Sequence, residues 1–135
     1  MIRVIVVDDH PMVRYSISRL LSKQQDIVVV GEGADGRAAL DLIEQVKPDI
    51  LVLDIEMPLM NGIEVAEHMY QHDSPTKIII LSNYTDRGLV EELLALGASG
   101  YVVKDDAPGH LVNAVHEVYA DSTGWLSPGV QSSLH

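Results

Sequence analysis

Short apolar runs alternate along the chain with stretches in which apolar residues recur every three or four positions. The continuous runs are typical of strands buried on both faces of a parallel sheet. Five strands are predicted in this way: Ile2–Val7, Ile27–Val30, Asp49–Asp54, Lys77–Leu81 and Gly100–Val103. The periodic stretches indicate amphipathic helices with one buried face. Five helices are predicted with their caps: Met12–Ser22, Asp35–Val46, Asn61–Tyr70, Asp86–Leu96 and Pro108–Tyr119.

The regular alternation of strand and helix predicts the fold class. Strands joined through helices by short links pair in parallel, and their crossovers are right-handed. We therefore predict a flavodoxin-like α/β fold, with a doubly wound five-stranded parallel sheet in the order 2-1-3-4-5 and five helices on its faces. Residues 120–135 differ in kind, because they are rich in Ser, Gly and Pro and their apolar residues are scattered. They indicate a linker or a partly docked tail.

Composition narrows the class of protein. The 135 residues suit one domain, and 47% of them are apolar, which is enough for a core. The net charge of −11 repels a nucleic acid backbone, so this segment is not expected to bind DNA directly. The sequence has no cysteine, which excludes disulfides and thiolate metal sites. No run approaches the roughly 20 apolar residues of a membrane span, and the chain begins as a strand rather than a signal peptide, so we expect a cytoplasmic location.

Polar residues of a particular kind follow four of the predicted strands: Asp8-Asp9, Asp54, Ser82 and Lys104. The carboxyl ends of parallel strands meet at one edge of the sheet, where open α/β folds place their sites. Two carboxylates ~4 Å apart repel by about 4 kcal/mol at an effective dielectric constant of ~20. Such a cluster needs a proton, the ammonium of Lys104 or a bound cation. Hard oxygen ligands favour Mg²⁺, which commonly also takes phosphate oxygens, so we predict a site for Mg²⁺ and a phosphoryl group.

These residues, in this order and at these intervals, resemble the receiver domain of a bacterial two-component response regulator. The resemblance covers Met1 to about Tyr119 and rests on Asp8-Asp9, Leu51–Pro58 with Asn61-Gly62, Ser82, Gly97-Ala98, Gly100-Tyr101 and Lys104. It implies a receiver domain over residues 1–119. Asp8–Arg14 and Trp125–Pro128 are similar to NarL/FixJ-type regulators, in which a LuxR-type helix-turn-helix DNA-binding domain follows. That output domain is absent from this chain, and residues 120–135 are expected to lead toward it.

The resemblance implies a phosphorylation site with a metal. Asp54 would be the nucleophile that accepts a phosphoryl group from a sensor histidine kinase and becomes an acyl phosphate. Asp9 and Asp54 would ligate Mg²⁺ directly, Glu56 through its backbone carbonyl and Asp8 mainly through water. Taken alone, an Asp after an apolar run also suits a helix cap or a turn. The six histidines, His10 among them, show no metal-ligand spacing and are predicted to lie on surfaces or helix faces.

The resemblance also implies a switch. Lys104 would pair with Asp54 before the reaction and with a phosphate oxygen afterwards. Ser82 would turn its hydroxyl toward another phosphate oxygen, which leaves space for Tyr101 to rotate inward. Asn83 and Tyr84 stand after Ser82, where a smaller residue is common, so we expect them to narrow access to phosphorylated Asp54 and to slow its hydrolysis.

Other functions fit the same pattern less well. The expected output is control of transcription, with a homodimer on phosphorylation, DNA contact only through the absent domain and no role as a turnover enzyme. The alternative is a stand-alone receiver that acts through protein contacts. A phosphatase of the haloacid dehalogenase class would use Glu56 as its second acid, but Met57-Pro58 replace the Thr or Val that usually follows. A flavodoxin-like cofactor binder would need a phosphate loop where Asp8-Asp9 would repel phosphate.

Overall fold

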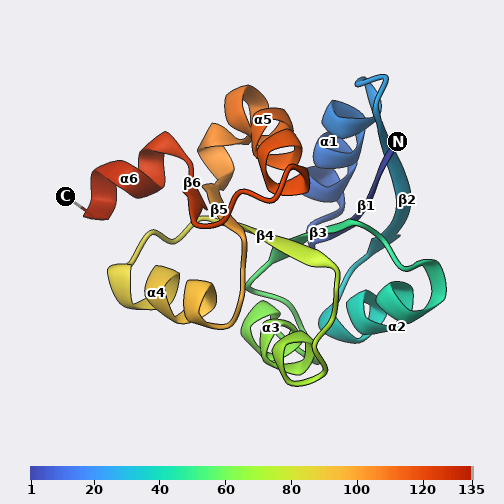
Figure 1. The fold of residues 1–135 in the computed structure, drawn as a ribbon, viewed down its shortest axis with the longest axis horizontal. Helices are drawn as coiled ribbons and strands as arrows, with labels where there is room; N and C mark the ends of the chain where they lie inside the picture. The colour runs from blue at the N-terminus through green and yellow to red at the C-terminus, as the bar shows by residue number, and fades with distance from the viewer. Residues whose placement is uncertain (135) are drawn as a thin grey trace.

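A parallel sheet runs through the middle of the fold and carries helices on both faces (Figure 1). The structure is a computed structural model, and it describes residues 1–134. The strands are β1 Ile2–Val7, β2 Ile27–Gly33, β3 Ile50–Asp54, β4 Lys77–Ser82, β5 Gly100–Val103 and β6 Trp125–Leu126. The helices are α1 Pro11–Ser22, α2 Gly36–Val46, α3 Gly62–Gln71, α4 Arg87–Ala95, α5 Ala107–Tyr119 and α6 Pro128–Leu134, with a 3-10 turn η1 at Lys104–Asp106.

The sheet confirms the predicted class and corrects the predicted number of elements. Within residues 1–134 the strand order is 2-1-3-4-5-6, so the expected order is extended by one strand and one helix, both from the tail. The backbone N–H of Trp125 donates to the Ser99 carbonyl (3.0 Å), and that of Ser127 donates to the Tyr101 carbonyl (3.1 Å). Short elements of this kind escape periodicity, because two residues of strand show no repeat. His135, the last residue of the predicted tail, lies outside the described residues.

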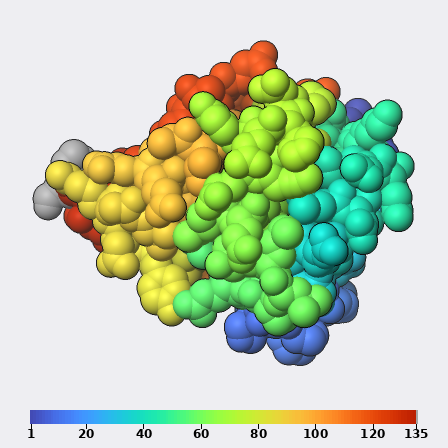
Figure 2. Space-filling view, turned by 90° about the horizontal axis from the view of Figure 1, so that it is seen from below, coloured from blue at the N-terminus to red at the C-terminus, as the bar shows by residue number. Residues whose placement is uncertain are grey.

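Two hydrophobic cores lie on opposite faces of the sheet. In β3, Ile50 and Val52 pack with α1 and α5, whereas Leu51 and Leu53 pack with α2, α3 and α4. This alternation is the period of two that a strand imposes, and it shows why β3 must be apolar throughout. Figure 2 shows the face with which Leu51 and Leu53 pack, where α4 (yellow), α3 (green) and α2 (cyan) cover the sheet. Val130 of α6 is fully buried and belongs to the same core.

The helices of residues 1–134 are all too short or too polar to cross a membrane. Their placement on the two faces leaves the carboxyl ends of β1, β3, β4 and β5 together at one edge of the sheet. The polar residues singled out in the sequence stand at this edge.

Candidate phosphorylation and metal site

Three carboxylates and one imidazole meet where β1 and β3 end. Asp8 and Asp54 are buried, with 1% and 4% of their surfaces exposed, and the side chain of Asp9 is 31% exposed. Asp8, Asp9, His10 and Asp54 each offer one ligand atom, and these four atoms lie within 4.8 Å of one another. The structure thus brings together the three aspartates that the sequence analysis placed at one edge of the sheet.

His10 is the member of this cluster that sequence reasoning missed. Its ring is 65% exposed, in keeping with a surface histidine, but its Nδ1 lies 3.0 Å from Oδ1 of Asp9 and 3.5 Å from Oδ1 of Asp8. Its backbone N–H donates to Oδ1 of Asp8 (2.9 Å). Its position in the sequence could have indicated this role, because His10 directly follows Asp8-Asp9. At the start of α1 its ring lies beside both aspartates.

Lys104 supplies the positive charge of the site. Its Nζ lies 3.1 Å from Oδ2 of Asp8 and 3.5 Å from Oδ1 of Asp54, and only 13% of its side chain is exposed. The family resemblance implies a pair between Lys104 and Asp54, and in the structure the ammonium lies between the two aspartates and nearer to Asp8. One cation therefore faces three carboxylates, which leaves the cluster with excess negative charge.

The environment of Asp54 opposes its charged form. Burial raises the pKa of Asp54 from its ordinary value of 3.8 to about 6, and the neighbouring charge of Asp8 adds to this rise. Lys104 and a hydrogen bond from the backbone of Glu56 lower the pKa but do not cancel the effect of burial. At neutral pH the carboxylate is ionised but poorly compensated, which favours a cation or an electrophile beside it.

The donor set fits Mg²⁺. Oδ2 of Asp54 is buried and has no hydrogen-bond partner among the described residues, so one oxygen of this carboxylate is free for a ligand. Carboxylate oxygens are the ligands that a hard cation prefers, and Mg²⁺ is usually held by one or two of them. Glu56 follows two residues after Asp54 in the adjoining loop, with its side chain exposed.

Two glycines hold the loop between Asp54 and α3 close to the sheet. A Cβ on Gly62 would lie 2.5 Å from the carbonyl oxygen of Asp54, and one on Gly36 would lie 2.2 Å from that of Met60. The N–H of Gly62 donates to the Ile55 carbonyl (2.8 Å), so the chain turns back directly after the strand. Because neither glycine has a side chain, the loop can lie close to the end of β3 at Gly62 and close to the start of α2 at Gly36.

Ser82, Tyr84 and Tyr101 form a connected group beside the aspartates. Ser82 is buried, and its Oγ accepts a hydrogen bond from the N–H of Tyr84 (3.0 Å). The ring of Tyr101 is fully buried, and its hydroxyl donates to the Tyr84 carbonyl (2.5 Å). Burial raises the pKa of Tyr101, so the hydroxyl keeps its proton and remains a donor. Tyr101 therefore lies inward in this structure. This is the orientation that the family resemblance implies for Tyr101 after Ser82 has moved.

Asn83 and Tyr84 directly follow Ser82 and are both exposed. A hydrogen bond with Glu56 raises the pKa of the Tyr84 hydroxyl, and the nearby charge of Glu56 acts in the same direction. This contact joins the loop after β4 to the loop after β3.

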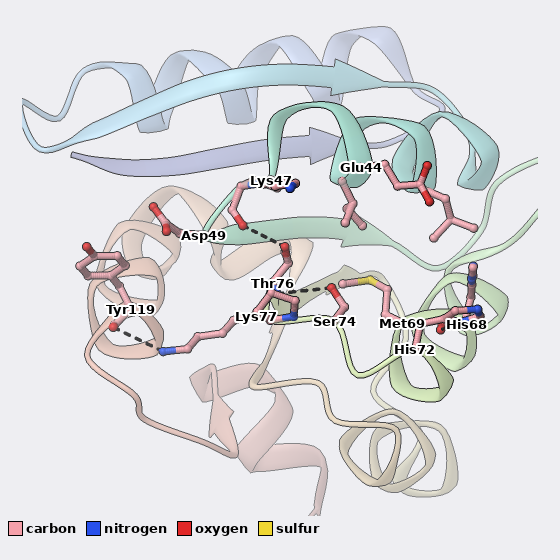
Figure 3. A pocket seen from close by; sticks show the side chains of 14 residues that line it. Glu44, Lys47, Asp49, His68, Met69, His72, Ser74, Thr76, Lys77 and Tyr119 are labelled. Carbon is pink, nitrogen blue, oxygen red and sulfur yellow. Dashed lines mark hydrogen bonds between the residues drawn. The ribbon is translucent and has the colours of Figure 1, made fainter.

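A hollow of about 580 Å³ lies away from these residues, at the other end of the sheet. Figure 3 shows its wall, which comes from α2, α3, the start of β4 and the end of α5 and includes His68, Thr76 and Tyr119. The Thr76 hydroxyl donates to the Pro48 carbonyl (2.8 Å), which ties β4 to the segment before β3. Its lining contains none of the aspartates, serine or lysine of the predicted site, so the hollow is separate from that site.

Comparison with known proteins defines the class that this fold and site represent. The profile of the response regulator receiver domain family matches residues 4–116, and the chain belongs to this family. The resemblance noted in the sequence is thereby confirmed.

Individual relatives place the chain close to NarL- and DegU-type regulators. It is 34% identical to the transcriptional regulatory protein DegU of Brevibacillus brevis over 133 residues, which cover 98% of this chain and 56% of DegU. It is 36% identical to the nitrate/nitrite response regulator protein NarL of Escherichia coli over 134 residues, which cover 97% of this chain and 62% of NarL. A two-component response regulator of the LuxR family from Aurantimonas sp. SI85-9A1 has the same fold, with a TM-score of 0.90, 35% identity and coverage of 96% of this chain and 92% of that one. The chain thus spans little more than half the length of these two curated relatives.

Proposed function

We propose that this chain receives a phosphoryl group on Asp54 and that the modified site controls transcription through an output domain. The observation that carries the proposal is the position of Asp54, buried at the end of β3 with one free carboxylate oxygen, two further aspartates and the Lys104 ammonium around it. The donor is expected to be a sensor histidine kinase, as membership of the receiver family implies.

The chemistry is a transfer of the phosphoryl group to a carboxylate. An oxygen of ionised Asp54 attacks the phosphorus of the donor in line, the bond from phosphorus to the donor atom breaks, and an acyl phosphate remains on Asp54. The transition state is loose, so positioning and charge stabilisation supply most of the rate. When bound, Mg²⁺ would neutralise the oxygens of the transferring group, with Asp9, Asp54 and the Glu56 carbonyl as its ligands and Asp8 acting through water.

Lys104 changes its partner during this reaction. In the structure its ammonium contacts Asp8 and Asp54, and it can follow the negative charge from Asp54 to a phosphate oxygen by a small movement of a flexible side chain. The Ser82 hydroxyl would then exchange the Tyr84 N–H for a second phosphate oxygen. This exchange releases the loop that also holds the Tyr101 hydroxyl, so the state of Asp54 reaches the face of α4 and β5.

The output is proposed to be gene regulation by a homodimer whose DNA contacts belong to a separate domain. The support is the similarity to DegU and NarL, which are named as a transcriptional regulatory protein and a response regulator and are both longer than this chain. The alternative, a stand-alone receiver that acts only through protein contacts, is distinguished by the full-length gene, which would then encode no output domain.

Intact mass after incubation with acetyl phosphate or phosphoramidate tests the proposal. We expect the native protein to gain one phosphoryl group in the presence of Mg²⁺, and we expect no gain with excess chelator or in the Asp54→Asn variant. The variant is a matched control, because asparagine keeps the shape of the side chain and removes the nucleophile. A gain that persists in Asp54→Asn would place the acceptor elsewhere, and no gain in the native protein would reject the proposal.

A further inference from the structure

The folded tail, residues 125–134, contacts residues on both sides of Lys104. On the N-terminal side, the N–H of Val103 donates to Oγ of Ser127 (3.1 Å). On the C-terminal side, the N–H of Gly129 donates to Oδ2 of Asp106 (2.8 Å). Lys104 stands between these two anchor points, at the first position of η1.

Ser127 is the centre of this arrangement. It is fully buried, and its Oγ accepts the N–H of Val103, while the neighbouring Gly129 N–H donates to Asp106. Its backbone N–H donates to the Tyr101 carbonyl (3.1 Å). Ser127 therefore contacts the strand before Lys104 through both its side chain and its backbone, and Gly129, two residues further on, contacts the turn after Lys104.

The geometry of the site makes this contact relevant to chemistry. Lys104 lies just beyond β5, a strand of only four residues. Its ammonium must reach both Asp8 and Asp54 across the carboxyl ends of the strands. A strand at the edge of a sheet has one row of backbone groups unpaired. The pairing of β6 with β5 supplies partners for these backbone groups up to Tyr101 and so restrains the strand there. The hydrogen bonds of Ser127 and Gly129 extend this restraint to the residues on both sides of Lys104.

We propose that the tail positions Lys104 for phosphoryl transfer, with Ser127 and Asp106 as the positioning residues. This inference rests on the proposed function of Asp54. Because coupling between two sites is reciprocal, the charge that Lys104 faces must also bias the docking of the tail. The segment that leads toward an output domain would thereby be coupled to the catalytic lysine through Val103 and Asp106, in addition to its contact with Tyr101.

The packing of Gly129 shows how tightly the tail is seated. A Cβ at this position would lie 2.7 Å from Cγ1 of Val103 and 2.9 Å from Oδ2 of Asp106. The side chain of Arg87 in α4 also donates to the Leu134 carbonyl, which ties the end of α6 to a second element. The tail is therefore held closely enough to impose a position on its neighbours.

The test measures the rate of phosphorylation by phosphoramidate, followed by intact mass, at saturating Mg²⁺ and well below the unfolding temperature. We expect Ser127→Ala to lower the rate constant by about tenfold, because a misplacement of ~1 Å can cost as much as roughly 100-fold. The Mg²⁺ dissociation constant should not change, since Asp8, Asp9 and Asp54 make no hydrogen bond with the tail among the described residues. Ser132→Ala, at an exposed position of α6, is the control for the same chemical change.

Asp106→Ala provides a second variant at a half-buried position that is less able to disturb folding. Asp105→Ala is its matched control, because it removes the same charge from the neighbouring exposed residue. We expect Asp106→Ala to lower the rate constant and Asp105→Ala to leave it close to that of the native protein. Equal effects of the two substitutions would show that charge alone is responsible and would overturn the proposal.

A double-mutant cycle separates positioning from general destabilisation. If Ser127 acts through Lys104, Ser127→Ala has no further effect on the rate constant once Lys104 is replaced by alanine. An undiminished tenfold effect in the Lys104→Ala background would overturn the inference. If the native protein is phosphorylated and Ser127→Ala reacts at the same rate, the inference alone fails, whereas absence of phosphorylation in the native protein rejects the function of Asp54 itself.

Discussion

The buried position of Asp54 disfavours the charged form of its carboxyl group. Burial and the charge of Asp8 raise its pKa to about 6, and a single ammonium from Lys104 compensates only in part. A group arranged for stability alone would be paired or exposed. The same features that make the ionised carboxylate costly make it ready to accept a cation or a phosphoryl group.

This cost predicts how Asp54→Asn changes stability with pH. The folded state holds the proton of Asp54 up to about pH 6, whereas the unfolded chain releases it near the ordinary pKa of 3.8. The contribution of Asp54 to the free energy of unfolding therefore falls as pH rises between these values, and the total loss is about 3 kcal/mol. We therefore expect the free energy of unfolding of Asp54→Asn, relative to that of the native protein, to rise by about 3 kcal/mol between pH 4 and pH 7.

Urea unfolding of both proteins across this range, with chelator present to remove Mg²⁺, measures the difference. The comparison cancels the titration of the other groups, because both proteins share them. A difference in stability that is constant with pH would contradict the raised pKa.

Asn83 and Tyr84 predict the lifetime of the phosphorylated state. Both are exposed and directly follow Ser82, and Glu56 raises the pKa of the Tyr84 hydroxyl. Removal of these side chains should admit water to the acyl phosphate. We expect Asn83→Ala and Tyr84→Ala each to raise the rate of dephosphorylation by roughly three- to tenfold, which corresponds to about 0.7–1.4 kcal/mol in the barrier.

The measurement is the decay of the phosphorylated mass after removal of the donor. Ser132→Ala, far along the chain in α6, serves as the unaffected variant. An unchanged lifetime in both Asn83→Ala and Tyr84→Ala would show that access is controlled elsewhere.

At the scale of elements, the loop between β3 and α3 determines where Asp54 points. Asn61 begins α3 with a capping box: its side chain accepts from the N–H of Glu64 (2.9 Å), and the Glu64 side chain accepts from the N–H of Asn61 (3.1 Å). The start of the helix is thus well defined. Gly62 then brings the first turn of α3 against the carbonyl of Asp54, so the helix and the strand end are in direct contact.

Gly62→Ala should therefore damage both stability and phosphorylation. The added methyl would lie 2.5 Å from the Asp54 carbonyl oxygen and 2.8 Å from Cα of Ile55, both of which are backbone atoms. We expect a loss of about 1–3 kcal/mol in the free energy of unfolding, as is typical of overpacking. The phosphorylation rate should also fall, because the backbone of the acceptor has to move.

Gly109→Ala in α5 is the matched control, since a Cβ there would meet no atom within 4 Å. Alanine is the better helix former, so this variant should be stabilised by up to about 1 kcal/mol. Equal urea midpoints for the two variants would mean that the loop yields freely and does not hold Asp54.

At the scale of the whole molecule, the tail is part of the domain. Its strand β6 extends the sheet, and Val130 of α6 is fully buried in the core that also contains Tyr101. Packing of this kind makes a segment unfold together with its neighbours rather than separately.

Val130→Ala tests this cooperativity. The loss of two buried methyl groups should lower the free energy of unfolding by about 2 kcal/mol, within a single transition. Exposed Ser132, two residues away on the same helix, should tolerate alanine with little change in the urea midpoint. A variant that melts the tail in a separate early transition, and leaves the main one unmoved, would contradict a single cooperative unit.

The alternation of apolar runs and amphipathic periods was sufficient to predict the class of fold and the five principal strands and helices. It was sufficient because each of these elements is long enough to display its own period and is buried on a face that the period identifies. The charged edge could be predicted for a related reason. Once the strands are known to be parallel, their carboxyl ends must meet, and Asp8, Asp54 and Lys104 follow those ends directly.

Only the tertiary structure decided the features that depend on contacts between distant segments. The strand β6 exists because the β5 edge offers partners to Trp125 and Ser127, and two residues carry no period of their own. His10 joins the aspartates because a turn folds it back, and the sharing of Lys104 between Asp8 and Asp54 is a matter of distances across the sheet edge. Sequence patterns record local burial, whereas partners far apart along the chain are chosen by packing.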